Sequence, residues 1–279
     1  MESAARQVDV YGVNHSPWVQ AVLLGLHAAG IPHSLTSIPP LETFRTSGVM
    51  MPAASIDGGH WQLESADILR NVGFDAITDE QMRLVRGAWQ GVMHRADSAA
   101  LFWGAFSLAG DRSPVPIRRL ANNFLRSFVT FYFFLLIRSA PLFTPRREPE
   151  DYGEQFLPFE SMLATSGTSY LSGQAPNTLD FLLFGIIQCH CSIYVPPVTA
   201  LQSDPRLTSL RAWIGRMQER LVGYPHLYSG LFFPPHVSPP AWSSPLDRTA
   251  FWLGGLAMLT LFPITVPFIA ILAIRNRRS

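Results

Sequence analysis

The sequence predicts an α/β domain at the start of the chain, an all-α helical domain after it, and one apolar helix near the end. Three observations support this prediction. Short apolar stretches alternate with a helical pattern over residues 8–72, helical periodicity prevails from residue 78 onward, and residues 250–274 contain no charged side chain. Apolar residues two positions apart indicate strands, whereas a spacing of three or four indicates helices.

The first domain is predicted to occupy residues 1–75 and to begin with a strand at residues 8–11. A helix-like run at 19–29 follows, and Gly30-Ile31-Pro32 is typical of a helix end. Residues 33–38 alternate polar and apolar side chains, as a strand does. For residues 39–48 we expect a short connection, with any helix there reduced to a turn.

The second half of this domain is predicted to contain two strands and a helix. A strand begins at Met51-Pro52, and Asp57-Gly58-Gly59 is a hairpin signal before the next strand at residues 60–63. Residues 66–74 then supply the last helix, with Glu64-Ser65 at its start.

This order resembles the thioredoxin-like N-terminal domain of the cytosolic glutathione S-transferase superfamily. The resemblance depends on three short motifs in sequence order: the turn Asn14-His15-Ser16-Pro17-Trp18, the pair Met51-Pro52, and Leu63-Glu64-Ser65-Ala66. It implies that glutathione is the co-substrate. It also places Ser16, or His15, where the family's catalytic residue stabilises the glutathione thiolate. Trp18 would border the second substrate, a hydrophobic electrophile, together with Trp89 or Trp103.

The other site residues are likewise implied by the resemblance. Pro52 would follow a cis peptide bond, and Met51 would offer its backbone to the cysteinyl part of glutathione. Glu64 and Ser65 would hold the γ-glutamyl amine and carboxylate through charge-assisted hydrogen bonds. Arg45 is the one cation near this region that we expect to reach the glycyl carboxylate.

Each motif also has a purely structural interpretation. A Ser-Pro pair before a helix is commonly an N-cap followed by Pro at the first helical position. Glu-Ser at a helix start is likewise ordinary capping chemistry. The functional interpretation therefore depends on the order and spacing of the three motifs, and not on any one of them.

The helical domain is predicted to span residues 76–222. Helices are expected from residue 82 toward 101, over 117–137 and over 151–166, with a closing helix from Pro205. In residues 169–182, Asn177 is the predicted N-cap of a buried helix, and Asp180 should accept a hydrogen bond from its backbone N–H. This motif resembles the start of the central helix in the transferase family, so the resemblance covers residues 8–221.

Composition restricts the partners. The chain has 279 residues, a net charge of +1 and no lysine, so no strong positive field favours nucleic acid. Its two cysteines, Cys189 and Cys191, are two positions apart on a predicted helix and point to different faces. We interpret them as buried small hydrophobes in a reducing compartment and expect no metal site. A homodimer is expected by analogy with the family.

The end of the chain predicts a membrane anchor. Residues 223–249 are rich in proline and indicate an extended linker. Residues 250–274 are long enough to cross a bilayer as one transmembrane helix, although Pro263 and Pro267 would kink it or permit a hairpin. The N-terminus lacks the apolar region of a secretory signal. We therefore expect a single-pass C-terminal anchor with the globular part in the cytosol. The basic tail after residue 274 opposes the positive-inside tendency in that orientation, and an interfacial or hairpin anchor would avoid the conflict.

Two function classes follow. The first is a membrane-anchored glutathione S-transferase-like enzyme that conjugates or reduces hydrophobic electrophiles. The second is a non-catalytic, membrane-tethered interaction module of the same fold, as in metaxin-like proteins. A chloride-channel-like relative is a third class, but the apolar segment lies at the opposite end of the chain from the one it would require.

Overall fold

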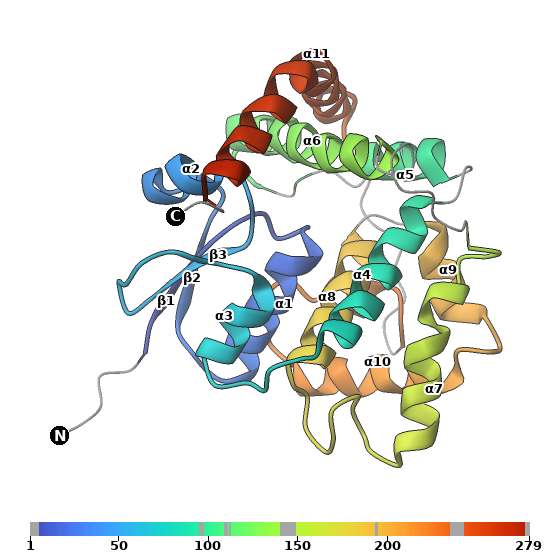
Figure 1. Cartoon of the computed structure of the whole chain (residues 1–279). Coiled ribbons are helices and arrows are strands. Elements are labelled where there is room, and N and C mark those ends of the chain that lie inside the picture. Colours follow the sequence, from blue (N-terminus) through green and yellow to red (C-terminus); the bar gives the residue numbers. More distant parts are fainter. Residues whose placement is uncertain are drawn as a thin grey trace. The chain divides into compact units, whose positions relative to one another are not determined.

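A computed structural model of the chain describes residues 6–94, 98–108, 111, 113–139, 149–192, 195–234 and 243–276. The chain forms two compact units (Figure 1). Unit 1 consists of Met1–Trp89, Gly153–Ser192 and Pro197–Ser238, and unit 2 of the intervening and C-terminal stretches. Both units are therefore discontinuous in sequence.

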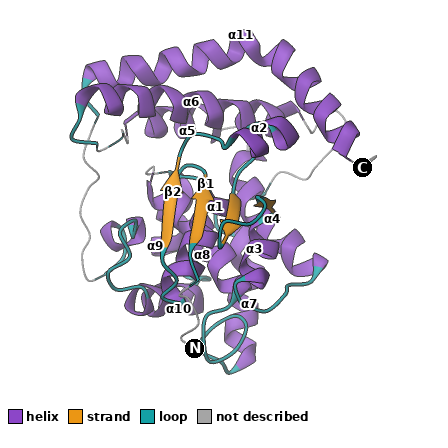
Figure 2. Cartoon of the chain, turned by 90° about the vertical axis from the view of Figure 1, so that its left-hand side faces the viewer, coloured by secondary structure: helices purple, strands orange, loops and turns teal. Residues whose placement is uncertain are grey.

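The sheet of unit 1 has four strands in the order β2-β1-β3-β4. The strands are β1 (Val8–Tyr11), β2 (His33–Thr36), β3 (Ala53–Ile56) and β4 (Gln62–Leu63). β1 is parallel to β2 and antiparallel to β3, which in turn is antiparallel to β4. The strand layer lies among helices in Figure 2. With its helices this domain has the βαβαββα order of a thioredoxin-like fold, as predicted.

Three helices complete this domain: α1 (Pro17–Ala28), α2 (Leu41–Ser47) and α3 (Ser65–Asn71). The reduction of α2 to a turn was a wrong expectation, because residues 41–47 form a short helix. Asp57 and Gly58 have φ values of 51° and 71°, which confirms the hairpin between β3 and β4. The Ser55 hydroxyl donates to the carbonyl of Gly59 at 2.6 Å and ties that turn to β3.

An all-helical part follows the thioredoxin-like domain. In unit 1 it contains the first part of α4 (Asp79–His94), then α7 (Leu157–Ser166), α8 (Thr178–Ser192), α9 (Pro196–Ser203) and α10 (Thr208–Arg220). Every residue of α8 is buried, as its nearly unbroken apolar sequence predicts. α8 packs along α1, and the two backbones come so close at Gly185 that an added Cβ would lie 2.3 Å from the Pro17 carbonyl oxygen.

The start of α8 is fixed by the buried carboxylate of Asp180. It accepts a hydrogen bond from the backbone N–H of Asn177 at 3.2 Å, which confirms the predicted capping interaction. It also accepts from the Leu171 N–H at 2.9 Å and from the Trp213 indole N–H at 2.8 Å. Burial raises the pKa of Asp180, while these donors lower it. One carboxylate thus joins the loop before α8, the α8 N-terminus and α10.

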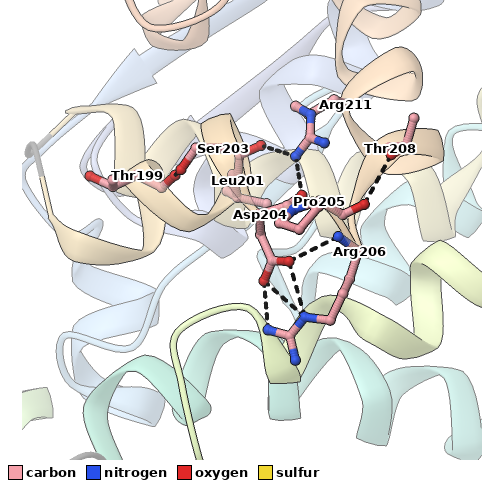
Figure 3. Close-up of polar contacts among 8 residues, drawn as sticks. All are labelled: Thr199, Leu201, Ser203, Asp204, Pro205, Arg206, Thr208 and Arg211. Atoms are coloured by element: carbon pink, nitrogen blue, oxygen red, sulfur yellow. Dashed lines mark hydrogen bonds and ion pairs between the residues drawn. The ribbon is translucent and has the colours of Figure 1, made fainter.

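Polar contacts also close the turn between α9 and α10 (Figure 3). The Arg206 guanidinium forms an ion pair with Asp204 at 2.6 Å, and Arg211 donates to the Asp204 carbonyl at 2.6 Å. The hydrogen bond from Arg206 lowers the pKa of Asp204. Gly153 lies against this pair, since a Cβ there would be 2.2 Å from an Asp204 carboxylate oxygen.

The first part of the predicted proline-rich linker is packed and not extended. The 3-10 turn η3 (Tyr228–Leu231) lies in this stretch, and Tyr224, Phe232 and Phe233 are buried. The Ser229 N–H donates to the Gln188 side chain of α8 at 2.9 Å. Residues 235–242, in the middle of the predicted linker, lie outside the described residues.

Unit 2 contains α5 (Ser98–Leu108), α6 (Pro116–Ser139) and the long α11 (Pro245–Asn276). α6 and α11 run side by side in Figures 1 and 2 and are parallel, since Arg119 pairs with Asp247 at 3.0 Å and Tyr132 packs near Phe262. The two backbones come close together at Gly254, where a Cβ would lie 2.2 Å from the Phe124 carbonyl oxygen. The expected helix over residues 117–137 is confirmed.

The predicted membrane segment forms most of α11, but the side chains of Val266 and of residues 268–274 lie outside the described residues. Among the residues that the structure describes, no single helix has the length and hydropathy needed to cross a bilayer. The pair formed by α8 and α9 meets that test only jointly, across a sharp bend.

Candidate functional site

The register of the sheet brings the three sequence motifs of unit 1 to one edge. Tyr11, the last residue of β1, is paired with Ala53, the first residue of β3. Ala53 is also paired with Leu63, the last residue of β4. The residues that come directly after β1, before β3 and after β4 therefore meet at the same end of the strands. These residues are the Ser16 turn, Met51-Pro52 and Glu64-Ser65.

Ser16 occupies the N-cap position of α1, and Pro17 is the first helical residue. Its backbone is extended, with φ −72° and ψ 128°, and its N–H donates to the Val13 carbonyl at 2.9 Å. Its hydroxyl makes no capping hydrogen bond to the helix. The ordinary structural use of an N-cap serine is thus not made here, and the half-buried hydroxyl remains beside the positive end of α1.

The peptide bond between Met51 and Pro52 is cis, as the resemblance implied. Gly12, on the turn that leads to Ser16, lies against this segment: an added Cβ would be 3.4 Å from the Met51 Cβ and 2.3 Å from a Val19 methyl group. Gly12 has a φ of 153°, a value that few side chains tolerate. The start of the turn that leads to Ser16 therefore lies close to the Met51 side chain.

Glu64 has a backbone conformation that is rare for its residue type. Its φ is 69° and its ψ 109°, and it is exposed at the end of β4, directly before Ser65 begins α3. A non-glycine residue in this region costs on the order of 1–3 kcal/mol, and such residues are concentrated at ligand-binding sites. Ser65 is nearly buried at 4% exposure. The strain falls on one of the residues predicted to hold the γ-glutamyl group.

Trp18, Arg45 and Trp103 are the remaining predicted site residues. Trp18 is half-buried in the first turn of α1, and its ring meets that of Trp89 edge-on at 6.1 Å. Arg45 is exposed in the last turn of α2, a helix that follows β2 at the same end of the sheet. Trp103 belongs to unit 2, where phenylalanine rings surround it, and is a core residue there.

Four side chains near the Ser16 turn were not predicted from the sequence to belong to the site. Gln20 of α1 is buried, and the other three come from the stretch after α10: Tyr224, His226 and Tyr228. The Tyr228 ring stacks on His15 at 5.6 Å, and the Asn14 amide lies 3.4 Å from His226 Nδ1. The only local signal for them was the aromatic and histidine-rich string Tyr224-Pro225-His226-Leu227-Tyr228, which differs from the purely proline-rich composition that follows.

Cys189 and Cys191 are buried free thiols in α8. Burial raises the pKa of Cys189 to about 12 and that of Cys191 above its usual range, while it lowers the pKa of His190 to about 3. Both thiols are therefore protonated at physiological pH and unsuited to nucleophilic chemistry, and the His190 imidazole is uncharged. Within the described part of the chain no cluster of three or more His, Cys, Asp or Glu side chains has the arrangement of a metal site.

No protein-family model and no curated protein matches the sequence. Solved structures with a similar arrangement include human glutathione-S-transferase T1-1 in its apo form, with 15% identity, 90% of this chain and 99% of that chain covered, and a TM-score of 0.46. A theta class glutathione S-transferase from Xanthomonas axonopodis pv. citri, with glutathione bound, is 19% identical over 80% of this chain and 95% of its own, with a TM-score of 0.42.

A glutathione S-transferase from Pseudomonas fluorescens is 18% identical over 78% of this chain and 98% of its own, with a TM-score of 0.41. Sequence identities and TM-scores this low give no information about activity. The assignment of the fold depends on the strand order, the strand directions and the helical part that follows, all of which were described above.

Proposed function

We propose that the sheet edge formed by Ser16, Met51-Pro52 and Glu64-Ser65 is a glutathione site, and that the protein transfers this thiol to hydrophobic electrophiles or uses it to reduce them. The observation that supports this most directly is the register that places the three motifs together, with a serine hydroxyl that does not cap its own helix. A fold alone does not give an activity, so the support for glutathione binding comes from these residues and their placement.

In this proposal Ser16 stabilises the sulfur in its anionic form. The hydroxyl donates a hydrogen bond to the thiolate, and the N-terminal end of α1 favours negative charge at the same place. Both effects lower the pKa of the thiol, so that more of it is present as the nucleophile at neutral pH. His15, the neighbouring residue, is the second candidate for this hydrogen bond.

The other residues position the tripeptide. Ser65 donates its hydroxyl to the γ-glutamyl carboxylate, and Glu64 accepts from the γ-glutamyl ammonium group. The strained backbone of Glu64 is consistent with a residue that a ligand requires in this orientation. Met51 supplies backbone donors and acceptors, and Arg45 is the cation proposed for the glycyl carboxylate. Trp18 and Trp89 offer an apolar aromatic pair for the electrophile.

Calorimetric titration of the full chain with glutathione tests the proposal. Wild type should bind in the millimolar range or tighter, and Ser65→Ala should weaken binding by about tenfold or more because a hydrogen bond to a charged group is lost. Ser16→Ala should raise the pKa of the bound thiol by about one unit or more, measured from thiolate absorbance against pH. Ser161→Ala, at an exposed position on α7, is the matched control. If no binding is detected at several millimolar glutathione while circular dichroism shows an intact fold, the proposed enzymatic function is refuted.

The second candidate function is the non-catalytic interaction module. The observation in its favour is a group of exposed apolar side chains on and before α2: Ile38 (72% exposed), Leu41 (63%) and Phe44 (45%). Exposed apolar groups of this kind commonly mark protein contacts. If glutathione does not bind, crosslinking of the full chain at Phe44, with Phe44→Ser as the comparison, is the experiment that tests this function.

We also propose that residues 250–274 hold the protein on a membrane, with the globular part in the cytosol. The stretch contains no charged residue, and arginines follow it at positions 275, 277 and 278. Several large apolar side chains of α11 are exposed, among them Leu253 (53%), Leu256 (57%) and Leu259 (52%). Such a face suits the hydrocarbon region, and the basic tail suits anionic headgroups.

Co-flotation of the full chain with liposomes that contain anionic lipid tests this anchor. Leu256→Glu should reduce flotation, because a carboxylate on the lipid-facing side is costly to bury. Leu246→Glu is the matched control, since Leu246 is 61% exposed on the same helix but precedes the uncharged stretch. Equal flotation of both variants and wild type would contradict the assignment of this segment.

A further inference from the structure

The turn that carries His15 and Ser16 is enclosed by a circuit of contacts with the stretch after α10. The Asn14 amide donates to His226 Nδ1 at 3.4 Å, and the His226 ring meets the Tyr224 ring edge-on at 5.9 Å. The Tyr224 hydroxyl donates to Gln20 Oε1 at 2.8 Å, and Gln20 Nε2 donates to the Asn14 carbonyl at 2.6 Å. Both the side chain and the carbonyl of Asn14 are thereby held.

A stack of rings adds a second attachment. His15 stacks on Tyr228 with ring centroids 5.6 Å apart and planes within 16° of parallel. Tyr228 in turn stacks on His226 at 6.4 Å. Aromatic pairs in such arrangements contribute beyond the area that they bury. The orientation of the His15 ring, directly before Ser16, therefore depends on residues more than 200 positions later in the chain.

The hydrogen bond between Tyr224 and Gln20 places one side of this circuit in the interior, while Asn14, His226 and Tyr228 are half-buried. Gln20 is fully buried and Tyr224 is 5% exposed, so the hydrogen bond between them is shielded from water. Removing one partner of such a bond leaves a buried polar group unsatisfied. The stretch itself is anchored on both sides of Tyr228, by α10 before it and by the Ser229 contact with Gln188 after it.

We propose that Tyr224, His226 and Tyr228, the "aromatic clamp", are positioning residues of the thiol site: they hold Asn14 and His15 and so set the place of the Ser16 hydroxyl. This inference rests on the proposed function. It assigns a role in thiol chemistry to a stretch that the sequence predicts to be a linker. None of the three clamp residues is required to touch the thiol, because their effect passes through the turn between β1 and α1.

The test uses the full chain and glutathione itself as the probe. Tyr224→Phe removes the hydroxyl that holds Gln20 but keeps the ring, and Tyr228→Leu removes the ring that stacks on His15. Both should raise the pKa of the bound thiol by half a unit or more and weaken glutathione binding by roughly threefold to tenfold, as expected for the loss of one buried hydrogen bond or one ring pair. Tyr228→Phe keeps the ring that stacks on His15 and should therefore change the thiol pKa and the binding less than Tyr228→Leu does.

Hydrogen–deuterium exchange provides a readout that does not require the thiol. Amides of residues 12–16 should exchange faster in Tyr224→Phe and Tyr228→Leu than in wild type. Tyr170→Phe is the control, since Tyr170 lies in the loop before α8 and has no contact with the Ser16 turn among those described. It should leave the thiol pKa, the binding and the exchange unchanged.

The outcomes separate the clamp from the proposed function. If wild type binds glutathione with a lowered thiol pKa and both clamp variants match it, the clamp is refuted while the glutathione site stands. If wild type does not bind glutathione, the proposed function fails, and with it the role of the clamp in thiol chemistry. In that case faster exchange in the variants still supports the clamp as the element that holds this turn, and unchanged exchange overturns that as well.

Discussion

Replacement of Gly185 by alanine is predicted to disrupt the packing of α8 on α1. A Cβ at this position would lie 2.3 Å from the Pro17 carbonyl oxygen and 3.0 Å from the Ala21 nitrogen. Both are backbone atoms of α1, so neither can rotate away, and the two helices must separate. Overpacking of this kind costs about 1–3 kcal/mol and more where the backbone is rigid.

Part of this cost is offset, because alanine is favoured over glycine in a helix by about 1 kcal/mol. We therefore expect Gly185→Ala to lower the free energy of unfolding by about 2 kcal/mol, which corresponds to a fall of roughly 4–8 °C in Tm for a domain of this size. Urea and thermal denaturation followed by circular dichroism provide the measurement.

Gly215→Ala is the matched control for this experiment. Gly215 is also inside a helix, α10, but a Cβ there meets no atom within 4 Å. Only the gain in helix propensity remains, so this variant should be more stable than wild type by about 0.5–1 kcal/mol. If Gly185→Ala is as stable as Gly215→Ala, the close approach of α1 and α8 is wrong.

Three further predictions concern single side chains. Asp180→Ala should destabilise the protein by about 3 kcal/mol or more in urea denaturation, because two buried donors and one partly buried donor lose their acceptor; a loss below 1 kcal/mol would contradict the network. Burial and the nearby His33 lower the pKa of His226. The neutral His226 ring therefore stabilises the fold above the unfolded pKa of about 6.5, and this stabilisation is lost as the pH falls through the lowered value. When Nδ1 is protonated, it can no longer accept the hydrogen bond from Asn14. The free energy of unfolding measured from pH 7.5 to 5 should therefore fall on the acid side, and His226→Phe should flatten that slope. Glu64→Gly should raise the free energy of unfolding by about 1 kcal/mol and weaken glutathione binding, because glycine adopts this positive φ without strain. An unchanged free energy of unfolding would argue against strain at this position.

Most of the thioredoxin-like domain could be predicted from local sequence signals. The proline after Ser16 marked the start of α1, and Asp57-Gly58 marked the hairpin through its need for positive φ. α2 was not expected, because its seven residues contain only two large apolar side chains, Leu41 and Phe44, which are too few to indicate a helix. Its formation is thus set by the chain around it and not by its own pattern.

The candidate site was predictable only in part for a similar reason. The capping bond between Asp180 and Asn177 spans three residues and follows from a local rule, whereas the bond from Trp213 to the same carboxylate joins residues 33 apart. The aromatic clamp joins residues more than 200 apart, through rings and side-chain amides with no fixed spacing. Local sequence patterns do not encode such pairings. Because a proline-rich sequence follows residues 224–228, these residues were interpreted as part of a linker.

The packing of α1 against α8 has a consequence for the order of events during synthesis. α1 ends at Ala28 and α8 begins at Thr178, so about 150 further residues must be synthesised before the helix that packs most extensively on α1 appears. At translation rates of about 5–20 residues per second this interval lasts on the order of 10–30 s. Over that time the side of α1 that packs on α8 lacks its partner, so we expect the nascent chain to expose this apolar surface to solvent until α8 has been synthesised.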